Sequence, residues 1–139
     1  MKQNINKNLI RSYRKSVKFH LDLSSELEDI IIGLMLGDLF AEKKNSNSNT
    51  RLQFKQSNEN KEYIDHLYDI FKEYCLSKPK QSSSFDRRPN KNKVYYSIKF
   101  STLSLPCFNK FRSLFYDSLG VKFIPDQLEE LLTSKSLAY

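Results

Sequence analysis

The sequence predicts an α+β fold whose elements follow the order α-β-β-α-β-β-α around one four-stranded antiparallel sheet. Two pairs of segments alternate apolar and polar residues, which is the two-residue period of a half-buried strand. Each pair is separated by a short polar turn and therefore predicts a hairpin. The stretches between the hairpins carry apolar residues at helical spacing. With 139 residues, of which 39% are hydrophobic, the chain is long enough for one domain with a substantial core.

The amino-terminal part divides into an arm and a first helix. Residues 1–23 are polar, basic and weakly periodic, and we interpret them as an arm, partly ordered at most, ahead of a domain over residues 24–139. Ser25 is followed three residues later by Glu28, which is the spacing of a capping box. A helix is therefore expected from Ser25 to about Gly37.

The first hairpin is expected over residues 38–44 and 50–57, joined by an Asn- and Ser-rich turn. In its second strand Leu52 and Phe54 point to the apolar face of the predicted sheet. The polar residues that point the other way are Arg51, Gln53 and Lys55.

A helix from Asn60 to Cys75 should follow, ended by Pro79 and the serine run 82–84. The stretch "SFDRRPNKNKVYYSIKF" predicts a second hairpin with its turn at Pro89–Asn92. Its return strand alternates as well. The inward residues are expected to be Val94, Tyr96, Ile98 and Phe100, and the outward ones Lys93, Tyr95, Ser97 and Lys99.

The last elements are helical. Ser104 is expected to cap a helix with Pro106 in its first turn and Gly120 at its end. A short helix should follow Pro125. Three helices would then cover the apolar face of the sheet and leave its polar face open.

The charge pattern predicts a polyanionic partner. The net charge is +7 and the isoelectric point about 9.4, which favours nucleic acid first and a membrane surface second, with solubility as the alternative explanation. The longest apolar run, Ile30 to Leu36, is too short to span a bilayer, so no membrane partner is expected. Cations and amides on an open sheet face suit phosphates and base edges. The predicted DNA-binding residues are Arg51, Gln53, Lys55, Arg87, Arg88, Lys93, Tyr95, Ser97 and Lys99.

Gly33 and Gly37 lie one turn apart on the same side of the first helix. Each costs about 1 kcal/mol relative to Ala inside a helix, so a close helix–helix contact is expected to compensate. A closely packed ordinary core explains the spacing equally well. Asp38 follows at the negative end of the helix dipole, beside unpaired carbonyl oxygens. These oxygens suit Mg²⁺, although an exposed aspartate leaving a helix is an equal alternative.

The segment "IIGLMLGDL" at residues 31–39 resembles the signature motif of the LAGLIDADG homing endonucleases. Ile31, Ile32 and Gly33 stand at its start, Gly37 at its seventh position and Asp38 at its acid, while Leu39 departs from the final Gly. The resemblance continues through "RLQFKQSNENKEYIDHLYDIF", "STLSLPCFNKF" and "KFIPDQLEELLTSKSLAY", and so covers residues 27–139.

This resemblance implies a half-fold with a saddle-shaped sheet that lies in the DNA major groove, and signature helices that pack together through Gly33 and Gly37. It implies that Asp38 and the Gly37 carbonyl bind Mg²⁺ or another divalent cation such as Mn²⁺. Gln53 matches a polar residue near the scissile phosphate. Lys122 matches the basic residue that positions the attacking water or stabilises the phosphorane, although a plain surface lysine is the alternative. Cleavage of both strands would then serve homing of the intron that encodes the enzyme.

One signature acid is present where the reaction needs two. The closing "SLAY" resembles the first residues of a second motif. The chain is therefore expected to be the first half of a longer protein, with homodimerisation or a degenerate reading frame as the alternatives. The chain has no Trp, whereas similar family members place a Trp directly after the residues that match "SLAY". Some mitochondrial codes read UGA as Trp, so a UGA codon is expected after Tyr139. Abundant Lys, Asn and Ile indicate an A+T-rich, organellar genome.

Two further functions stay open at this stage. The chain could act as an RNA maturase on its host intron, or as a DNA-binding domain without catalysis. Cys75 and Cys107 are too few for a zinc site or a disulfide framework, and we interpret them as small buried hydrophobic residues in a reducing compartment. His20 and His66 are not assigned to the site.

Overall fold

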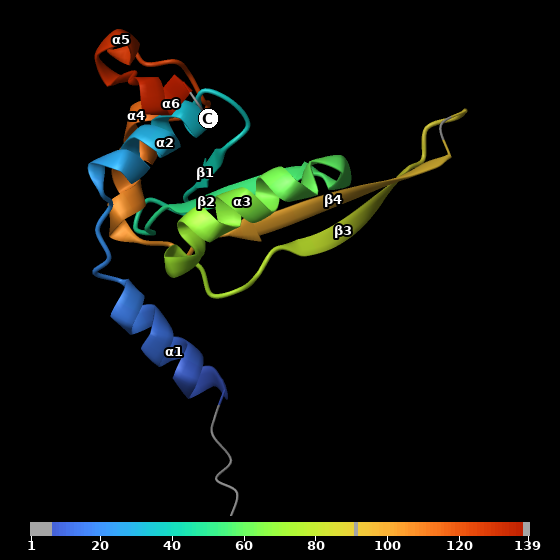
Figure 1. Ribbon diagram of the computed structural model, residues 1–139, viewed down its shortest axis with the longest axis horizontal. Coiled ribbons are helices and arrows are strands. Elements are labelled where there is room, and N and C mark those ends of the chain that lie inside the picture. Colours follow the sequence, from blue (N-terminus) through green and yellow to red (C-terminus); the bar gives the residue numbers. More distant parts are fainter. Residues whose placement is uncertain (1–6, 91, 138–139) are drawn as a thin grey trace, which may run out of the picture.

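The computed structural model describes residues 7–90 and 92–137 and confirms the predicted order of elements (Figure 1). The sheet and the helices around it are α2 (Ser25–Met35), β1 (Phe40–Glu42), β2 (Arg51–Ser57), α3 (Lys61–Phe71), β3 (Lys80–Asp86), β4 (Lys93–Ser101) and α4 (Asn109–Phe115). A helix α1 (Lys7–Lys18) precedes them, and α5 (Leu128–Leu131) and α6 (Ser134–Leu137) follow. Single 3-10 turns occupy Asn58–Asn60, Lys72–Tyr74 and Pro106–Phe108.

The four strands are antiparallel neighbours in the order β1-β2-β4-β3. Phe54 of β2 lies directly opposite Phe100 of β4, and the two rings stack with centroids 4.4 Å apart and planes 8° from parallel. Both side chains are buried, as is Leu52, so the predicted inward face of β2 is confirmed. This aromatic pair joins the two central strands from within the core.

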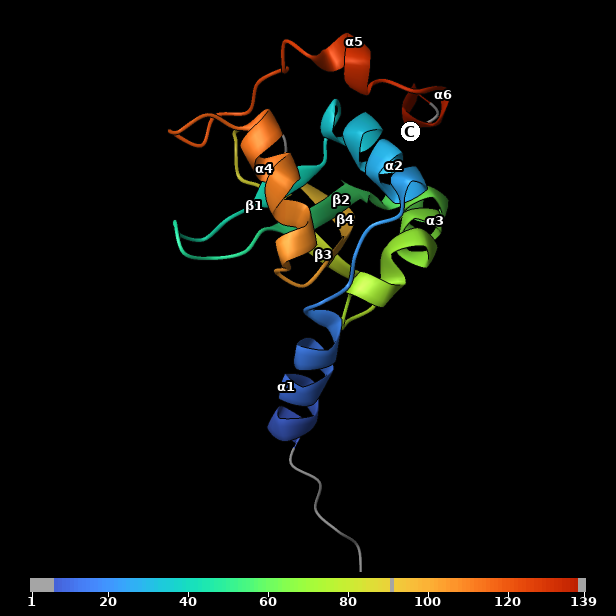
Figure 2. The same cartoon turned by 90° about the vertical axis from the view of Figure 1, so that its left-hand side faces the viewer.

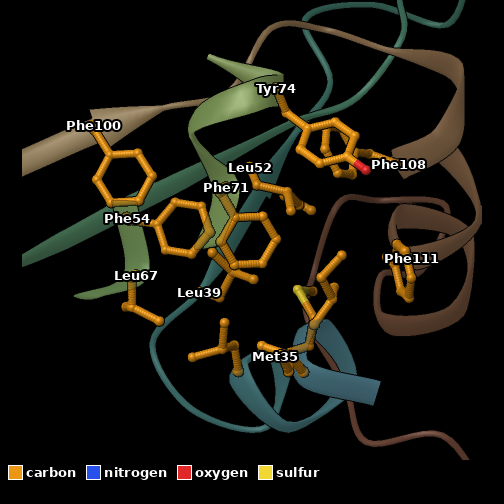
Figure 3. Close-up of a cluster of buried hydrophobic side chains, with 14 of the residues drawn as sticks. Met35, Leu39, Leu52, Phe54, Leu67, Phe71, Tyr74, Phe100, Phe108 and Phe111 are labelled. Carbon is orange, nitrogen blue, oxygen red and sulfur yellow. The ribbon is translucent and has the colours of Figure 1, made fainter. Parts of the chain in front are cut away.

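The core lies between this face and the helices α2, α3 and α4 (Figures 2 and 3). Phe71 from α3 packs against Phe54 with ring centroids 5.0 Å apart, and Tyr74 packs edge-on against Phe108 at 5.6 Å. Met35 contributes the end of α2 to the same cluster. The substantial core expected from the composition is therefore present and rich in aromatic residues, and apolar burial of this kind is the main favourable term in folding.

The outer half of the second hairpin differs from the prediction. Val94 and Tyr96 were expected to face inward but are 44% and 53% exposed, while Ile98 and Phe100 are buried. The reason is that β3 and β4 run past the amino-terminal start of α3, so the helix layer stops before the sheet does (Figure 1). The serine run 82–84, expected to end a helix, instead lies inside β3, where Ser82 Oγ and Ser97 Oγ are 3.0 Å apart.

Helix boundaries shift by a few residues from those expected. Ser24, rather than Ser25, caps α2, because its Oγ accepts a 3.1 Å hydrogen bond from the Leu27 N–H. The predicted helix around Pro106 ends at Phe115, where the next residue is extended. Gly120 lies in a later turn at φ +80°, a conformation that favours glycine.

A regular helix occupies much of the segment that the sequence predicts to be a weakly ordered arm. Residues 7–18 form α1, which projects from the body at the end of the molecule opposite α5 and α6 (Figures 1 and 2). None of its residues is buried. The prediction missed this helix because its periodicity is carried by only four apolar residues, Leu9, Ile10, Tyr13 and Val17. Within the described ranges, no helix is both long and apolar enough to cross a membrane.

The close helix contact predicted for the two glycines occurs at one of them. α2 packs against α6, and a Cβ at Gly33 would overlap the backbone carbonyl oxygen of Ser136. Gly37 is exposed, and a Cβ there would meet only the Leu34 carbonyl oxygen of its own helix at 3.6 Å. The partner of Gly33 is thus Ser136, the first residue of the "SLAY" segment that resembles the start of a second motif.

Replacing Gly33→Ala should lower the free energy of unfolding by about 1–3 kcal/mol, because the backbones of α2 and α6 must separate. Gly37→Ala is the matched control and should stay within about 0.5 kcal/mol of the unmodified chain. Urea unfolding followed by circular dichroism measures both. Equal stability of the two variants would contradict the contact.

Burial raises the pKa of the Cys75 thiol to about 12 and that of Cys107 to about 11. Iodoacetamide at about pH 8 should therefore label both thiols far more slowly in the folded protein than in urea, with Cys107 reacting first. The folded-state pKa values of both thiols lie above the ordinary thiol pKa. The contribution of the two thiols to stability is therefore fully present below about pH 9 and is lost as the pH rises toward 11–12. Rapid labelling of Cys75 in the folded state would contradict this burial.

Candidate functional site

The end of α2 presents an exposed carboxylate beside backbone carbonyl groups. The helix ends at Met35 and continues as a turn in which the Gly37 N–H donates to the Leu34 carbonyl at 3.0 Å. Gly37 and Asp38 are exposed, and Leu39 turns back into the core. The carbonyls of a helix end have no partner within the helix, so this turn gathers oxygen atoms and negative charge at one point.

Lys122 binds this helix end directly. Its Nζ donates hydrogen bonds to the carbonyl oxygens of Gly37 and Leu39, each 2.8 Å long. The lysine is held there by a β-bridge between its own backbone and Tyr116, next to a 2.8 Å bond from the Phe123 N–H to the Phe115 carbonyl. The sequence predicted that Lys122 and Gly37 belong to one site, and the structure brings them into contact.

The electrostatics of Lys122 tie it to Asp38. Burial lowers the pKa of the Lys122 ammonium, and the negative charge of Asp38 partly offsets that effect. An ammonium has three donors, and two of them are used by the carbonyl oxygens. The third remains for a water molecule or an anionic oxygen beside Asp38.

The oxygens at this helix end fit a hard divalent cation in type. Asp38 offers an exposed carboxylate, and the Gly37 carbonyl keeps a second lone pair besides the one that accepts from Lys122. Mg²⁺ is commonly held by one or two carboxylates together with water and substrate phosphates. Among the described residues, no group of three or more His, Cys, Asp or Glu could hold a metal ion, so further ligands would have to come from a partner or a substrate.

A small hollow of about 260 Å³ places Lys55 near this carboxylate. Its lining includes Asp38, Lys55, Gln56 and Tyr63. These residues come from the turn after α2, from β2 and from α3, so the hollow brings Lys55 beside Asp38. The sequence placed Lys55 on the sheet face alone and left Gln56 and Tyr63 out of the site. Packing between elements distant in sequence was the missing signal.

The outward face of the sheet carries three lysines in a row. Lys55 of β2 pairs with Lys99 of β4, and Lys99 pairs with Lys80 of β3. Like charges directly opposite one another destabilise a sheet. None of the three forms a salt bridge within the part of the chain that is described. We call these residues the lysine row. Lys80 was not predicted because its segment, between Pro79 and the serine run 82–84, was expected to end a helix and not to form a strand.

Three other predicted DNA-binding residues contact acids, namely Arg51, Gln53 and Arg88. Glu42 Oε2 accepts from Arg51 Nε at 2.7 Å and from the Gln53 amide, so Gln53 is held on the sheet rather than beside Asp38. Near the turn, Arg88 Nη2 lies 2.7 Å from Asp86 Oδ2, and this ion pair holds the pKa of Asp86 below its usual range. Lys93, Tyr95, Ser97 and Lys99 alternate outward as predicted, and Arg87 is exposed after β3.

Comparison with known proteins places this arrangement among relatives. Residues 28–139 match the LAGLIDADG DNA endonuclease family. A probable intron-encoded endonuclease 1 of Wickerhamomyces canadensis is 30% identical over 134 residues, which are 96% of this chain and 54% of that protein. A cytochrome b mRNA maturase bI2 of Debaryomyces hansenii is 30% identical over 125 residues, 88% of this chain and 46% of that protein. The chain thus spans about half the length of the curated relatives it matches.

This chain is also similar to a solved structure, both in fold and in sequence. The homing endonuclease I-WcaI, bound to its DNA recognition sequence, superimposes with a TM-score of 0.79 at 28% sequence identity. The match covers 100% of this chain and 58% of that one. At this similarity the α+β half-fold expected from the signature motif is confirmed.

Lys122→Met should lower the free energy of unfolding by about 1–3 kcal/mol, because it leaves the Gly37 and Leu39 carbonyls without their charged donor. Lys72→Met, at an exposed position on the helical side, is the control and should change stability by less than about 0.5 kcal/mol. Chemical denaturation measures both. If Lys122→Met left the free energy of unfolding unchanged, the ammonium would not be holding the end of α2.

Proposed function

The chain belongs to the LAGLIDADG DNA endonuclease family, and from that premise we propose that it forms one half of a site-specific homing endonuclease that hydrolyses both strands of a DNA target. The structural neighbour bound to its recognition sequence supports a role in DNA binding. The intron-encoded endonuclease among the relatives supports an origin in a mobile intron.

The lysine row is the observation that carries DNA binding. Three directly opposed cations raise the energy of the isolated sheet, and no acid of the described chain compensates them through a salt bridge. Phosphate groups would remove that repulsion and release counterions. The serines and Tyr95 along the same strands offer hydroxyl groups that can form hydrogen bonds with base edges and phosphates.

The end of α2 supports the chemistry. Asp38 and the Gly37 carbonyl would hold a divalent cation, Mg²⁺ or another such as Mn²⁺, which would generate a hydroxide nucleophile and neutralise charge on the phosphate. Lys122 would use its remaining N–H to stabilise the phosphate oxygen or position the attacking water. Lys55, which lines the same hollow as Asp38, would bind a neighbouring phosphate oxygen. Gln53, which Glu42 holds on the sheet, would contact DNA from the sheet face.

We propose that a second motif-bearing half supplies the second acid. α6 already covers Gly33, whereas Gly37 is open. A homodimer through the Gly33–Gly37 face would require α6 to move away, so the contact favours a second half that continues the "SLAY" motif over a symmetric dimer. The coverage of about half of each relative supports the same arrangement.

A maturase is the second candidate function, because one relative is a cytochrome b mRNA maturase. The same basic face would serve intron RNA, and Asp38 would then be dispensable. That relative, together with the Lys, Asn and Ile content, also supports our proposal that the gene lies in a mitochondrial or other organellar genome.

In the chain joined to a second motif-bearing half, Asp38→Asn should abolish Mg²⁺-dependent nicking of plasmid DNA that carries the intron-less insertion junction, since it removes a metal-binding carboxylate. Binding to the same DNA should be unchanged or slightly tighter, because a charge that repels phosphate is lost. Gel electrophoresis and fluorescence anisotropy measure the two effects, with EDTA added to the unmodified chain as a second control.

Lys99→Ser tests the binding surface separately. It should weaken DNA binding and reduce the slope of log affinity against log salt by about 0.9. Binding of intron RNA without any binding of junction DNA would favour the maturase. Unchanged nicking by Asp38→Asn would overturn the proposed catalytic role.

A further inference from the structure

α1 (Lys7–Lys18) is strongly amphipathic yet buries no residue. At 3.6 residues per turn, its five cations fall within about 100° of arc. These cations are Lys7, Arg11, Arg14, Lys15 and Lys18. Packing into the core therefore does not explain this helix, and the gathering of its positive charge on one side requires another cause.

Two of these cations point into the hollow over the lysine row. Arg11 and Lys15, one helical turn apart, line a hollow of about 860 Å³ together with Lys55, Lys80 and Lys99. Its lining contains eight Lys or Arg residues and no Asp or Glu. Two elements far apart in sequence thus direct unbalanced positive charge into one concave space.

This placement is electrostatically unfavourable without a partner. Within the described chain neither Arg11 nor Lys15 forms a salt bridge, and both approach three further cations. The body holds the end of the helix through a hydrogen bond from Lys18 Nζ to the Glu73 carbonyl oxygen. An extended polyanion that enters the hollow would convert this repulsion into attraction.

We propose that α1 binds the sugar–phosphate backbone of the same DNA duplex that the lysine row contacts, through Arg11 and Lys15; this inference rests on the proposed DNA-binding function. A duplex fits better than a membrane, because the cations line a concave space shared with the sheet and a bilayer surface is flat. Phosphate contacts carry no base sequence, so α1 adds affinity to every DNA equally and lengthens the bound site on one side.

The test compares two double variants of the same helix. Arg11→Ala/Lys15→Ala removes the cations that line the hollow, and Lys7→Ala/Arg14→Ala removes the same charge from positions outside its lining. Anisotropy titrations over a salt series should show the slope of log affinity against log salt falling by about two for the first pair. The loss should be equal on junction DNA and on a random duplex. The second pair should change the slope by less than half as much.

Hydroxyl-radical footprinting gives an independent readout. The first pair should lose protection at one end of the site and keep the protection that depends on Lys99, with circular dichroism confirming that the helix content is retained. Equal effects of the two pairs, or an unshortened footprint, would overturn the role of α1. The role of α1 in DNA binding would also be overturned if Arg11→Ala/Lys15→Ala lost binding to phosphatidylglycerol vesicles but kept its DNA binding.

The outcome also separates this inference from the proposed function. If the unmodified chain binds DNA and Lys99→Ser weakens it while Arg11→Ala/Lys15→Ala does not, only the role of α1 fails. If the unmodified chain does not bind duplex DNA at all, both fail together.

Discussion

The stacked pair Phe54–Phe100 sets the register on which the outer surface of the sheet depends. Burial of both rings fixes which residues of β2 and β4 lie opposite one another. A slip of one residue would turn the apolar side chains to solvent, so the core enforces this register strongly. Because residues alternate between faces, the same pairing places Lys55 opposite Lys99 on the other side. The hydrophobic core therefore holds these cations together against their own repulsion.

The end of α2 shows a similar division of roles between stability and chemistry. The apolar residues of the helix anchor it in the core, and its last turn emerges at the edge of β1. Lys122 binds the free carbonyls of Gly37 and Leu39 from a loop more than eighty residues away in sequence. This contact satisfies the helix end and keeps a positive charge beside Asp38. The same lysine thus contributes to the fold and stands where an anionic substrate would need it.

Charge balance distinguishes the cations on the open surface. Arg51 and Arg88 are paired with Glu42 and Asp86, so an acid within the chain balances the charge of each. The lysine row and the two α1 cations that share its hollow have no such salt bridge among the described residues. Uncompensated charge in a concave surface is a stronger indicator of a polyanionic partner than net charge, because it identifies where the partner would lie.

The sequence by itself determined the order of helices and strands, the inward residues of β2 and the position of Asp38 after an apolar helix. These features depend on local periodicity and on residue types, both of which are properties of short stretches of sequence. Tertiary structure decided which distant groups meet: Lys80 with Lys99, Gly33 with α6, Lys122 with two carbonyls, and Glu42 with Gln53. It also decided that Val94 and Tyr96 are exposed, since the helix layer stops short of them. Such pairings follow from strand register and from helix packing, which no local pattern encodes.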